Sequence, residues 1–379
     1  MILLNGPNTK KISDKYIQDC LKTNWVSTSG RYIDLFKRKL KNITKSKYIN
    51  LLNSGTSSLH IALKVVGVSK DNEVICPSLT FIASINPILY LGANPIFFDC
   101  DEYHNINVLH VLEFLNNNTY FKNNFTYNMR TKKIIKAIIV VHMWGNVCDI
   151  RSLLKVCKKK NIKIIEDASE SLGSYYINKN KKIHTGSLGD VGCLSFNGNK
   201  IITCGSGGAI LTNNAKYHRE ANYYASQAKD DPIKFIHNDI GYNYRMPNIN
   251  AALGLGQLNK LNSFLKKKKK IRQWYHKKLK LKKYIELCKV PLVHNNNFWL
   301  NIIKLNKKYR YKPYDLYLKF KKKNIETRMI WFPCHLQKKL KLFQKYNIEN
   351  TKKYFDTCLC LPSGTLLTEK EIETVVNIL

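Results

Sequence analysis

The sequence predicts an α/β protein built on a mostly parallel sheet covered by helices. Short apolar runs alternate with amphipathic stretches over the first part of the chain, a pattern typical of parallel strands joined by helices. Near Pro247 this alternation gives way to a long helical stretch and then to shorter mixed elements. We therefore expect a large domain over residues 1–250 and a smaller α+β domain over residues 251–379.

Six apolar runs are interpreted as short buried strands because they are rich in Ile, Val, Leu and Phe and lie between turn residues. They cover residues 73–77, 94–101, 136–145, 163–169, 192–197 and 208–214. Helical segments are predicted over residues 51–67, 78–91 and 150–160, and shorter mixed elements over 297–305 and 325–333. Open parallel sheets carry their functional groups in loops just past the carboxyl ends of strands. Asp167 and Lys200 fall at such positions.

Composition favours a globular protein of the cytoplasm. The chain has 379 residues and is 44% hydrophobic, which suffices for a substantial core. We see neither an apolar run long enough to cross a membrane nor a secretory signal, so we expect no membrane partner and a cytoplasmic location. The 11 cysteines are scattered without C-x-x-C spacing. We therefore expect reduced thiols, with no metal site and no disulfide framework.

The chain is strongly basic, with 63 Lys and Arg against 26 Asp and Glu, so a nucleic-acid or anionic-membrane partner has to be considered. The excess is nearly all lysine and is spread along the chain. Even the run Lys266–Lys270 lies among apolar residues at helical spacing, which predicts a helix with its lysines on the solvated side. The apolar positions are Leu258, Leu261, Phe264, Leu265 and Ile271. We expect no nucleic-acid partner, and binding to random DNA or RNA that depends steeply on salt would contradict this.

Three features together point to one cofactor. The sequence SGTS at residues 54–57 precedes an apolar helical pattern; such a helix start either binds a phosphate or is merely capped by its hydroxyl groups. Asp167 ends a predicted strand, where a carboxylate can anchor a ring nitrogen. Lys200 follows a later strand that ends at Ser195, and a buried lysine that loses its proton attacks aldehydes. Phosphate cradle, carboxylate and lysine match pyridoxal 5'-phosphate.

The motifs resemble, almost end to end, the DegT/DnrJ/EryC1/StrS sugar aminotransferases. The resemblance is carried by segments such as NWVSTSGRYIDLF, LNSGTSSLHIAL, IEDASESLGSYY, SFNGNKIIT, GYNYRMPNINAALG and WFPCHLQ. It implies a fold-type-I pyridoxal-phosphate enzyme with a mostly parallel seven-stranded sheet sandwiched by helices. The same motifs look closest to the branch that acts on nucleotide-linked 4-keto-6-deoxy sugars, including the legionaminic-acid and bacillosamine-type enzymes.

Carried over residue by residue, the resemblance assigns roles. Lys200 forms the Schiff base with the cofactor, Asp167 pairs with its pyridine nitrogen and Glu170 lies beside its ring. Asn243 reaches the phosphate from the neighbouring subunit, which makes a homodimer part of the site. The remaining assignments are Phe81 stacked on the ring, Gly55, Thr56 and Ser195 at the phosphate, and His335 on the sugar side.

The resemblance also implies a reaction, the transfer of an amino group from L-glutamate to a keto sugar on a nucleotide. The expected acceptor is C4 of a UDP-GlcNAc-derived or GDP-linked 4-keto-6-deoxy hexose, in surface-glycan biosynthesis, with C3 left open. Relatives that remove a hydroxyl carry histidine in place of Lys200. A non-catalytic basic binding or scaffold protein on the same fold remains the rival interpretation. Cys204, Ser206 and Met329 depart from the family pattern.

Overall fold

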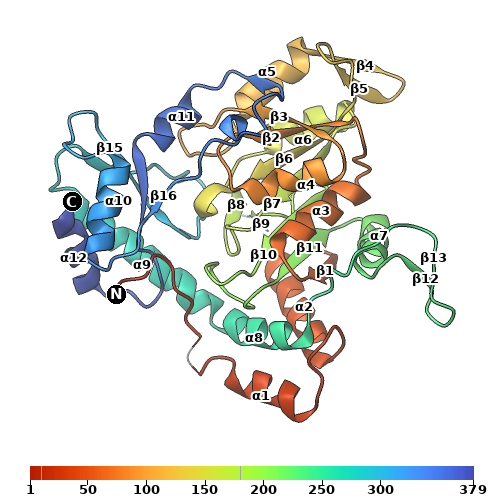
Figure 1. Ribbon diagram of the computed structural model, residues 1–379, viewed down its shortest axis with the longest axis horizontal. Helices are drawn as coiled ribbons and strands as arrows, with labels where there is room; N and C mark the ends of the chain where they lie inside the picture. The colour runs from red at the N-terminus through yellow and green to blue at the C-terminus, as the bar shows by residue number, and fades with distance from the viewer. Residues whose placement is uncertain (10, 180) are drawn as a thin grey trace.

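A computed structural model describes residues 1–9, 11–179 and 181–379. Its centre is an eight-stranded sheet in the order β1-β11-β10-β7-β6-β2-β3-β17 (Figure 1). The strands are β1 (Tyr48–Leu52), β2 (Glu73–Pro77), β3 (Asn94–Phe98), β6 (Ile135–Val141), β7 (Lys163–Asp167), β10 (Val191–Ser195), β11 (Gly208–Thr212) and β17 (Lys345–Tyr346). Within the described residues, only β11 runs against its neighbours. The predicted mostly parallel sheet is confirmed, and β17, from the C-terminal part, adds a short eighth strand.

Helices cover both faces of this sheet, and each face has its own apolar core. On one face, side chains of β2, β6 and β7 pack in a cluster that includes residues of α2 (Arg31–Thr44), α3 (Gly55–Val65) and α8 (Asn248–Asn259). On the other face, the cluster includes residues of α5 (Val108–Asn117) and α6 (Arg151–Lys159). Burial on both faces explains why the strands are almost continuously apolar.

The six predicted strands are all present, as β2, β3, β6, β7, β10 and β11. Of the central sheet, β1 and the short β17 were not predicted. β1 (Tyr48–Leu52) directly precedes α3, and the interpretation of residues 51–67 as one helical segment hid its last two residues. The segment predicted as a helix over 78–91 contains a short turn of 3₁₀-helix, η1 (Ile82–Ser84), and α4 (Asn86–Tyr90).

The C-terminal part has a second, antiparallel sheet in the order β14-β15-β18-β16. Its strands are β14 (Ile285–Leu287), β15 (Asn301–Leu305), β16 (Arg328–Met329) and β18 (Cys358–Leu361), and the helices around it include α9 (Leu261–Leu279), α10 (Pro313–Lys322), α11 (Asn350–Phe355) and α12 (Glu369–Ile378). α8 packs against α1 (Asp14–Lys22) and α2, whereas α9 packs against α12 and β14. Ile2 pairs with Ile325, so the chain also begins beside this part. A domain boundary at residue 250, which lies inside α8, stays a prediction.

The lysine run lies on α9, and its apolar neighbours Leu261, Phe264 and Ile271 are buried as predicted. The expectation that all five lysines face solvent is wrong for Lys268, which is 1% exposed. Its Nζ donates hydrogen bonds to Asn5 Oδ1 (2.6 Å), the Trp299 carbonyl (2.8 Å) and the Ser363 carbonyl (2.6 Å). Burial lowers the pKa of Lys268 to about 7. Three acceptors explain how the amine can be buried at all.

Smaller elements complete the chain. They are β4 (Thr119–Lys122), β5 (Phe125–Asn128), η2 (Met143–Gly145), β8 (Tyr175–Asn178), β9 (Lys181–His184), α7 (Ala215–Ala225), β12 (Lys229–Asp231), β13 (Ile236–His237) and η3 (Cys334–Leu336). The β12–β13 hairpin projects away from the body of the molecule (Figure 1). None of the helices in the described ranges combines the length and the apolar character that a membrane crossing requires.

Candidate active site

Most of the predicted site residues meet at one cavity of about 240 Å³. It lies past the carboxyl ends of β7 and β10 and beside the first turn of α3, as expected for an open α/β sheet. The residues brought together there are Gly55, Thr56, Phe81, Asp167, Glu170, Ser195 and Lys200. The loops of four separate strands therefore converge on a single point.

The start of α3 forms one wall of the cavity. Ser54 is the N-cap, its Oγ accepts from the N–H of Ser57 (3.0 Å), and the Ser57 hydroxyl accepts from the N–H of Ser54 (3.1 Å). The first N–H groups of a helix have no intrahelical acceptor. The cap uses the N–H of Ser57, and the two residues before it, Gly55 and Thr56, line the cavity. A Cβ on Gly55 would stand 2.8 Å from the Ser195 Cβ, so only glycine leaves this wall open.

Asp167 is held rigidly at the end of β7. Its Oδ2 accepts a hydrogen bond from the Ser84 hydroxyl (2.7 Å), and its Oδ1 accepts from the N–H of Ser169 (3.1 Å). The side chain is buried, with 4% exposed. A carboxylate fixed in this way can receive one more donor from the cavity without reorganising.

Lys200 and Glu170 face one another across the cavity. The Lys200 Nζ lies 3.8 Å from Glu170 Oε1 and 4.2 Å from the centroid of the Trp299 ring. Glu170 Oε2 accepts from the Trp144 N–H (2.6 Å). Burial lowers the pKa of Lys200, opposed by the charges of Glu170 and Asp167. Burial raises the pKa of Glu170 to about 7, opposed mainly by Lys200.

The further residues that line the cavity and were missed by the sequence interpretation include Ser84, Trp299, Arg328 and Trp331. Ser84 is the last residue of the segment PSLTFIAS, which also contains the predicted site residue Phe81, so the sequence could have indicated Ser84 as well. The other three come from the C-terminal part, where Trp331 begins the motif WFPCHLQ but no quoted motif contains Trp299 or Arg328. Phe81 is half exposed, and its ring centroid lies 5.1 Å from that of Trp331.

Two predicted residues are not among those that line the cavity in the described part of the chain. His335 is buried, and its Nδ1 shares a short hydrogen bond with the Ser78 hydroxyl. Asn243 is exposed, and its carbonyl accepts from Asn53 Nδ2 (3.3 Å) near the start of α3. Their roles toward the sugar and toward a neighbouring subunit stay predictions.

The departures after Lys200 keep the backbone intact. The Ser206 hydroxyl donates to the Asn53 carbonyl (2.6 Å), and Cys204 is fully buried against Gly254. A Cβ on Gly208 would stand 2.2 Å from the Ser54 carbonyl oxygen. The glycine therefore allows β11 to approach the start of α3 closely.

Comparison with known proteins decides the family. The DegT/DnrJ/EryC1/StrS aminotransferase family matches residues 7–379. The chain belongs to this family. It is 33% identical to the GDP-perosamine synthase of Escherichia coli O157:H7 over 85% of this chain and 82% of that protein. It is 32% identical to the UDP-4-amino-4,6-dideoxy-N-acetyl-beta-L-altrosamine transaminase of Campylobacter jejuni over 70% of this chain and 66% of that protein.

Solved structures share the fold. The E. coli GDP-4-keto-6-deoxy-D-mannose-3-dehydratase with bound hydrated PLP superposes with a TM-score of 0.86 at 20% identity, over 100% of this chain and 99% of that one. The predicted family and fold class are thus confirmed. The chain is a member of a family of pyridoxal-phosphate-dependent aminotransferases, as the sequence indicated.

The cavity fits that cofactor. Its walls offer the start of a helix for a phosphate, a fixed carboxylate for a pyridinium and a lysine amine of lowered pKa for an aldehyde. The glycine at residue 55 keeps open the space that any Cβ would fill.

Proposed function

We propose that this protein transfers an amino group from L-glutamate to a keto sugar carried on a nucleoside diphosphate, with Lys200 as the catalytic residue. The observation that carries the proposal is the meeting of a largely desolvated lysine amine, whose side chain is 15% exposed, with Asp167 and Glu170 at one cavity. Lysine side chains are seldom withdrawn from solvent to this extent unless they are paired. Here burial favours its neutral form, which can attack a carbonyl or take a proton.

The residues present supply each function that pyridoxal phosphate needs. Gly55, Thr56 and Ser195 hold the phosphate, and Asp167 keeps the ring nitrogen protonated. When bound, the cofactor supplies an electron sink for the carbon that loses its proton. Lys200 holds and returns that proton at its Nζ.

Glu170 and Trp299 position the lysine. The 3.8 Å separation between Lys200 Nζ and Glu170 Oε1 is too long for a hydrogen bond, so the amine is attracted without being locked. Trp299 holds the amine from the other side at 4.2 Å.

The acceptor is proposed to be C4 of a 4-keto-6-deoxy hexose, and the donor L-glutamate. The C4 assignment is supported by the name of the Campylobacter relative, which is a 4-amino-4,6-dideoxy sugar transaminase. Arg328 lines the cavity beside Trp331, and its guanidinium can bind a carboxylate or a phosphate in two-pronged fashion. His335 is proposed to act on the sugar side through its contact with Ser78.

A homodimer with shared sites, located in the cytoplasm, completes the proposal. Asn243 lies exposed near the outer side of the α3 start and is proposed to reach the phosphate of the neighbouring subunit. The nearby β12–β13 hairpin exposes Ile233, Phe235 and Ile240. Exposed apolar groups of this kind mark contact surfaces.

The cofactor link is tested by reducing the protein with borohydride in the presence of pyridoxal phosphate and mapping its peptides. We expect the added mass on the peptide that contains Lys200. Lys200→Ala should lose both this mass and glutamate-dependent turnover, while Lys266→Ala, a change on the exposed side of α9, should keep both. Equal turnover in Lys200→Ala and wild type would refute the proposal.

The acceptor is tested with a panel of nucleotide-linked 3-keto and 4-keto sugars and L-glutamate. Formation of a 4-amino sugar supports the C4 assignment, and formation of a 3-amino sugar contradicts it. Turnover with no member of the panel, by a protein that does carry the cofactor on Lys200, would leave the aminotransferase assignment standing and overturn the sugar class.

A further inference from the structure

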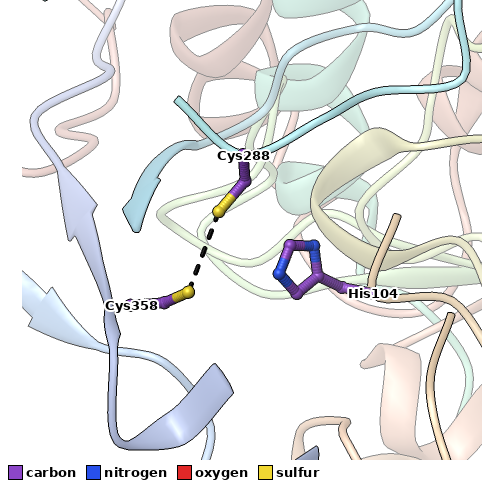
Figure 2. A group of neighbouring side chains, drawn as sticks. All are labelled: His104, Cys288 and Cys358. Carbon is purple, nitrogen blue, oxygen red and sulfur yellow. Dashed lines mark hydrogen bonds between the residues drawn. The ribbon is translucent and has the colours of Figure 1, made fainter. Parts of the chain in front are cut away.

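Three metal-binding side chains meet at a point outside the active site. They are His104, from the turn after β3, Cys288, which follows β14, and Cys358, which begins β18. Their ligand atoms all lie within 4.8 Å of one another, and all three residues are buried. Figure 2 shows the two sulfur atoms and the imidazole directed at one shared space.

The spacing of the sulfur atoms suits a metal and not a bond between them. The Cys288 and Cys358 Sγ atoms are 3.8 Å apart, whereas a disulfide needs about 2.05 Å. Two thiolates on a tetrahedral zinc ion, each at about 2.3 Å, stand about 3.8 Å apart. Two thiolates and one imidazole are ligands that zinc accepts and that hard ions such as magnesium avoid.

His104 supplies an independent sign that something is bound. Both of its ring nitrogens are buried and have no hydrogen-bond partner in the described residues. A buried polar atom without a partner costs about 1–3 kcal/mol. A metal on the nitrogen that faces the sulfur atoms removes one of these two costs.

The ring of His104 is also fixed in place. Its centroid lies 4.8 Å from that of Trp144 and 4.3 Å from that of Tyr354. The backbone at His104 is left-handed, with φ 68°, in a turn where the Asp101 carboxylate accepts from the N–H groups of Tyr103 (2.8 Å) and Asn105 (2.9 Å). The imidazole is thus preorganised toward the two cysteines.

One of the three residues borders a cavity. Cys288 lines a space of about 1240 Å³ between the turn at residues 101–103, α9 and the segment 285–294. This cavity can admit an ion and can supply a water molecule as its fourth ligand. A zinc site with three protein ligands and one water has an established coordination.

We propose that His104, Cys288 and Cys358 bind one zinc ion, with a water molecule from the cavity as the fourth ligand. Binding displaces the two thiol protons to solvent, so charge and protons balance. Because His104 belongs to the turn after β3, while Cys288 directly follows β14 and Cys358 begins β18 of the C-terminal sheet, the ion joins these two parts of the molecule. This inference does not depend on the aminotransferase reaction.

The test measures metal on untagged, reduced protein. After incubation with zinc chloride and gel filtration, elemental analysis should find one zinc ion per chain. Replacement by cobalt should give visible bands of tetrahedral intensity and a thiolate-to-cobalt charge-transfer band in the near ultraviolet, recorded against the cobalt-free protein. Zinc should also raise the melting temperature, because it binds only the folded chain.

Matched variants locate the site. Cys288→Ser and Cys358→Ser should each lose the zinc and the charge-transfer band, and His104→Ala should weaken zinc binding at least about tenfold. Cys157→Ser, which changes a buried thiol of α6, should keep the metal. Wild-type protein that retains no zinc, or zinc that persists equally in all variants, overturns the proposal. So does a Cys288–Cys358 disulfide in protein that takes up no zinc after reduction.

Discussion

At the scale of single residues, the active site places two poorly solvated groups of opposite charge close together. Glu170 is buried and the Lys200 side chain is only 15% exposed, so desolvation favours the neutral form of each, while their proximity favours the charged forms. The balance leaves Glu170 with a pKa of about 7. A carboxyl group whose pKa lies near neutral pH can exchange protons with a neighbouring lysine amine during a catalytic cycle.

We predict that Glu170→Gln changes the pH dependence of stability of the cofactor-free protein. The pKa of Glu170 is raised by burial from 4.5 to about 7, so the folded state binds more protons than the unfolded state between these values. The stability contributed by this group is full below pH 4.5 and is lost as pH rises to about 7. As pH rises across this window, the free energy of unfolding of the variant should therefore increase relative to that of wild type by up to about 3 kcal/mol.

Chemical denaturation at several pH values measures this difference. Glutamine keeps an acceptor for the Trp144 N–H, so the hydrogen bond at 2.6 Å is not lost with the charge. Glu286→Gln is the matched control, because the Glu286 side chain is 70% exposed. Parallel stability curves for wild type and Glu170→Gln would contradict the raised pKa.

The sequence predicted several residues of the site from local motifs, but it missed Trp331, which begins the motif WFPCHLQ. Asp167, Ser195 and Lys200 each follow a recognisable strand, and Gly55 and Thr56 begin a recognisable helix. Trp299, Arg328 and Trp331 reach the same cavity from the C-terminal part, and their placement depends on how the two sheets meet. His104, Cys288 and Cys358 lie far apart along the chain and share no spacing motif, so only the folded structure brings them together.

At the scale of elements, the close approach of β11 to the start of α3 shapes the cavity wall that is proposed to bind the phosphate. β11 passes so near the start of α3 that a side chain at residue 208 would meet the Ser54 carbonyl at 2.2 Å and the Ser58 Oγ at 2.5 Å. The obstructing group is backbone at a helix cap, which cannot rotate away. The strand β1 was missed because only one residue separates it from the N-cap of α3, so its last two residues were interpreted as part of the helix.

We predict that Gly208→Ala destabilises the protein by about 1–3 kcal/mol, because the added methyl group overpacks this contact. The shift of Ser54 should also weaken retention of pyridoxal phosphate, since the N–H groups of Gly55 and Thr56 move with it. Denaturation midpoints and cofactor retained after gel filtration measure the two effects.

Gly198→Ala is the matched control for this substitution. A Cβ at Gly198 meets no atom within 4 Å, so its stability should stay within about 0.5 kcal/mol of wild type. Equal stability of Gly208→Ala and Gly198→Ala would show that β11 and α3 can separate without cost.

At the scale of the whole molecule, the alternation of apolar and amphipathic segments predicted a mostly parallel central sheet, while charge does not reveal function. The net charge of +37 is spread along the chain, and the most basic run includes Lys268, which is buried and hydrogen-bonded to three acceptors. At least one lysine of this run therefore has a structural role. Burial of the run's middle member was not predictable, because its acceptors Asn5, Trp299 and Ser363 lie far away in the sequence.

The exposed apolar side chains of the projecting β12–β13 hairpin support the proposed homodimer. Ile233, Phe235 and Ile240 are 86%, 67% and 75% exposed, and Asn243 follows within the same loop. Burying such side chains is worth about 1.5–3 kcal/mol each. Burial of these side chains between two subunits would therefore stabilise a dimer relative to the separate chains.

We predict that the wild-type protein sediments as a dimer and that Ile233→Ser combined with Phe235→Ser raises the dimer dissociation constant at least about tenfold, since about 1.4 kcal/mol suffices for that change. The variant should also retain less pyridoxal phosphate, because Asn243 is proposed to reach the partner's cofactor. Leu342→Ser is the control: this leucine is 98% exposed and lies away from the hairpin, so the change should leave both properties intact. A hairpin variant that stays dimeric and keeps its cofactor would show that the subunits meet through another surface, and a monomeric wild-type protein with full turnover would remove the shared site altogether.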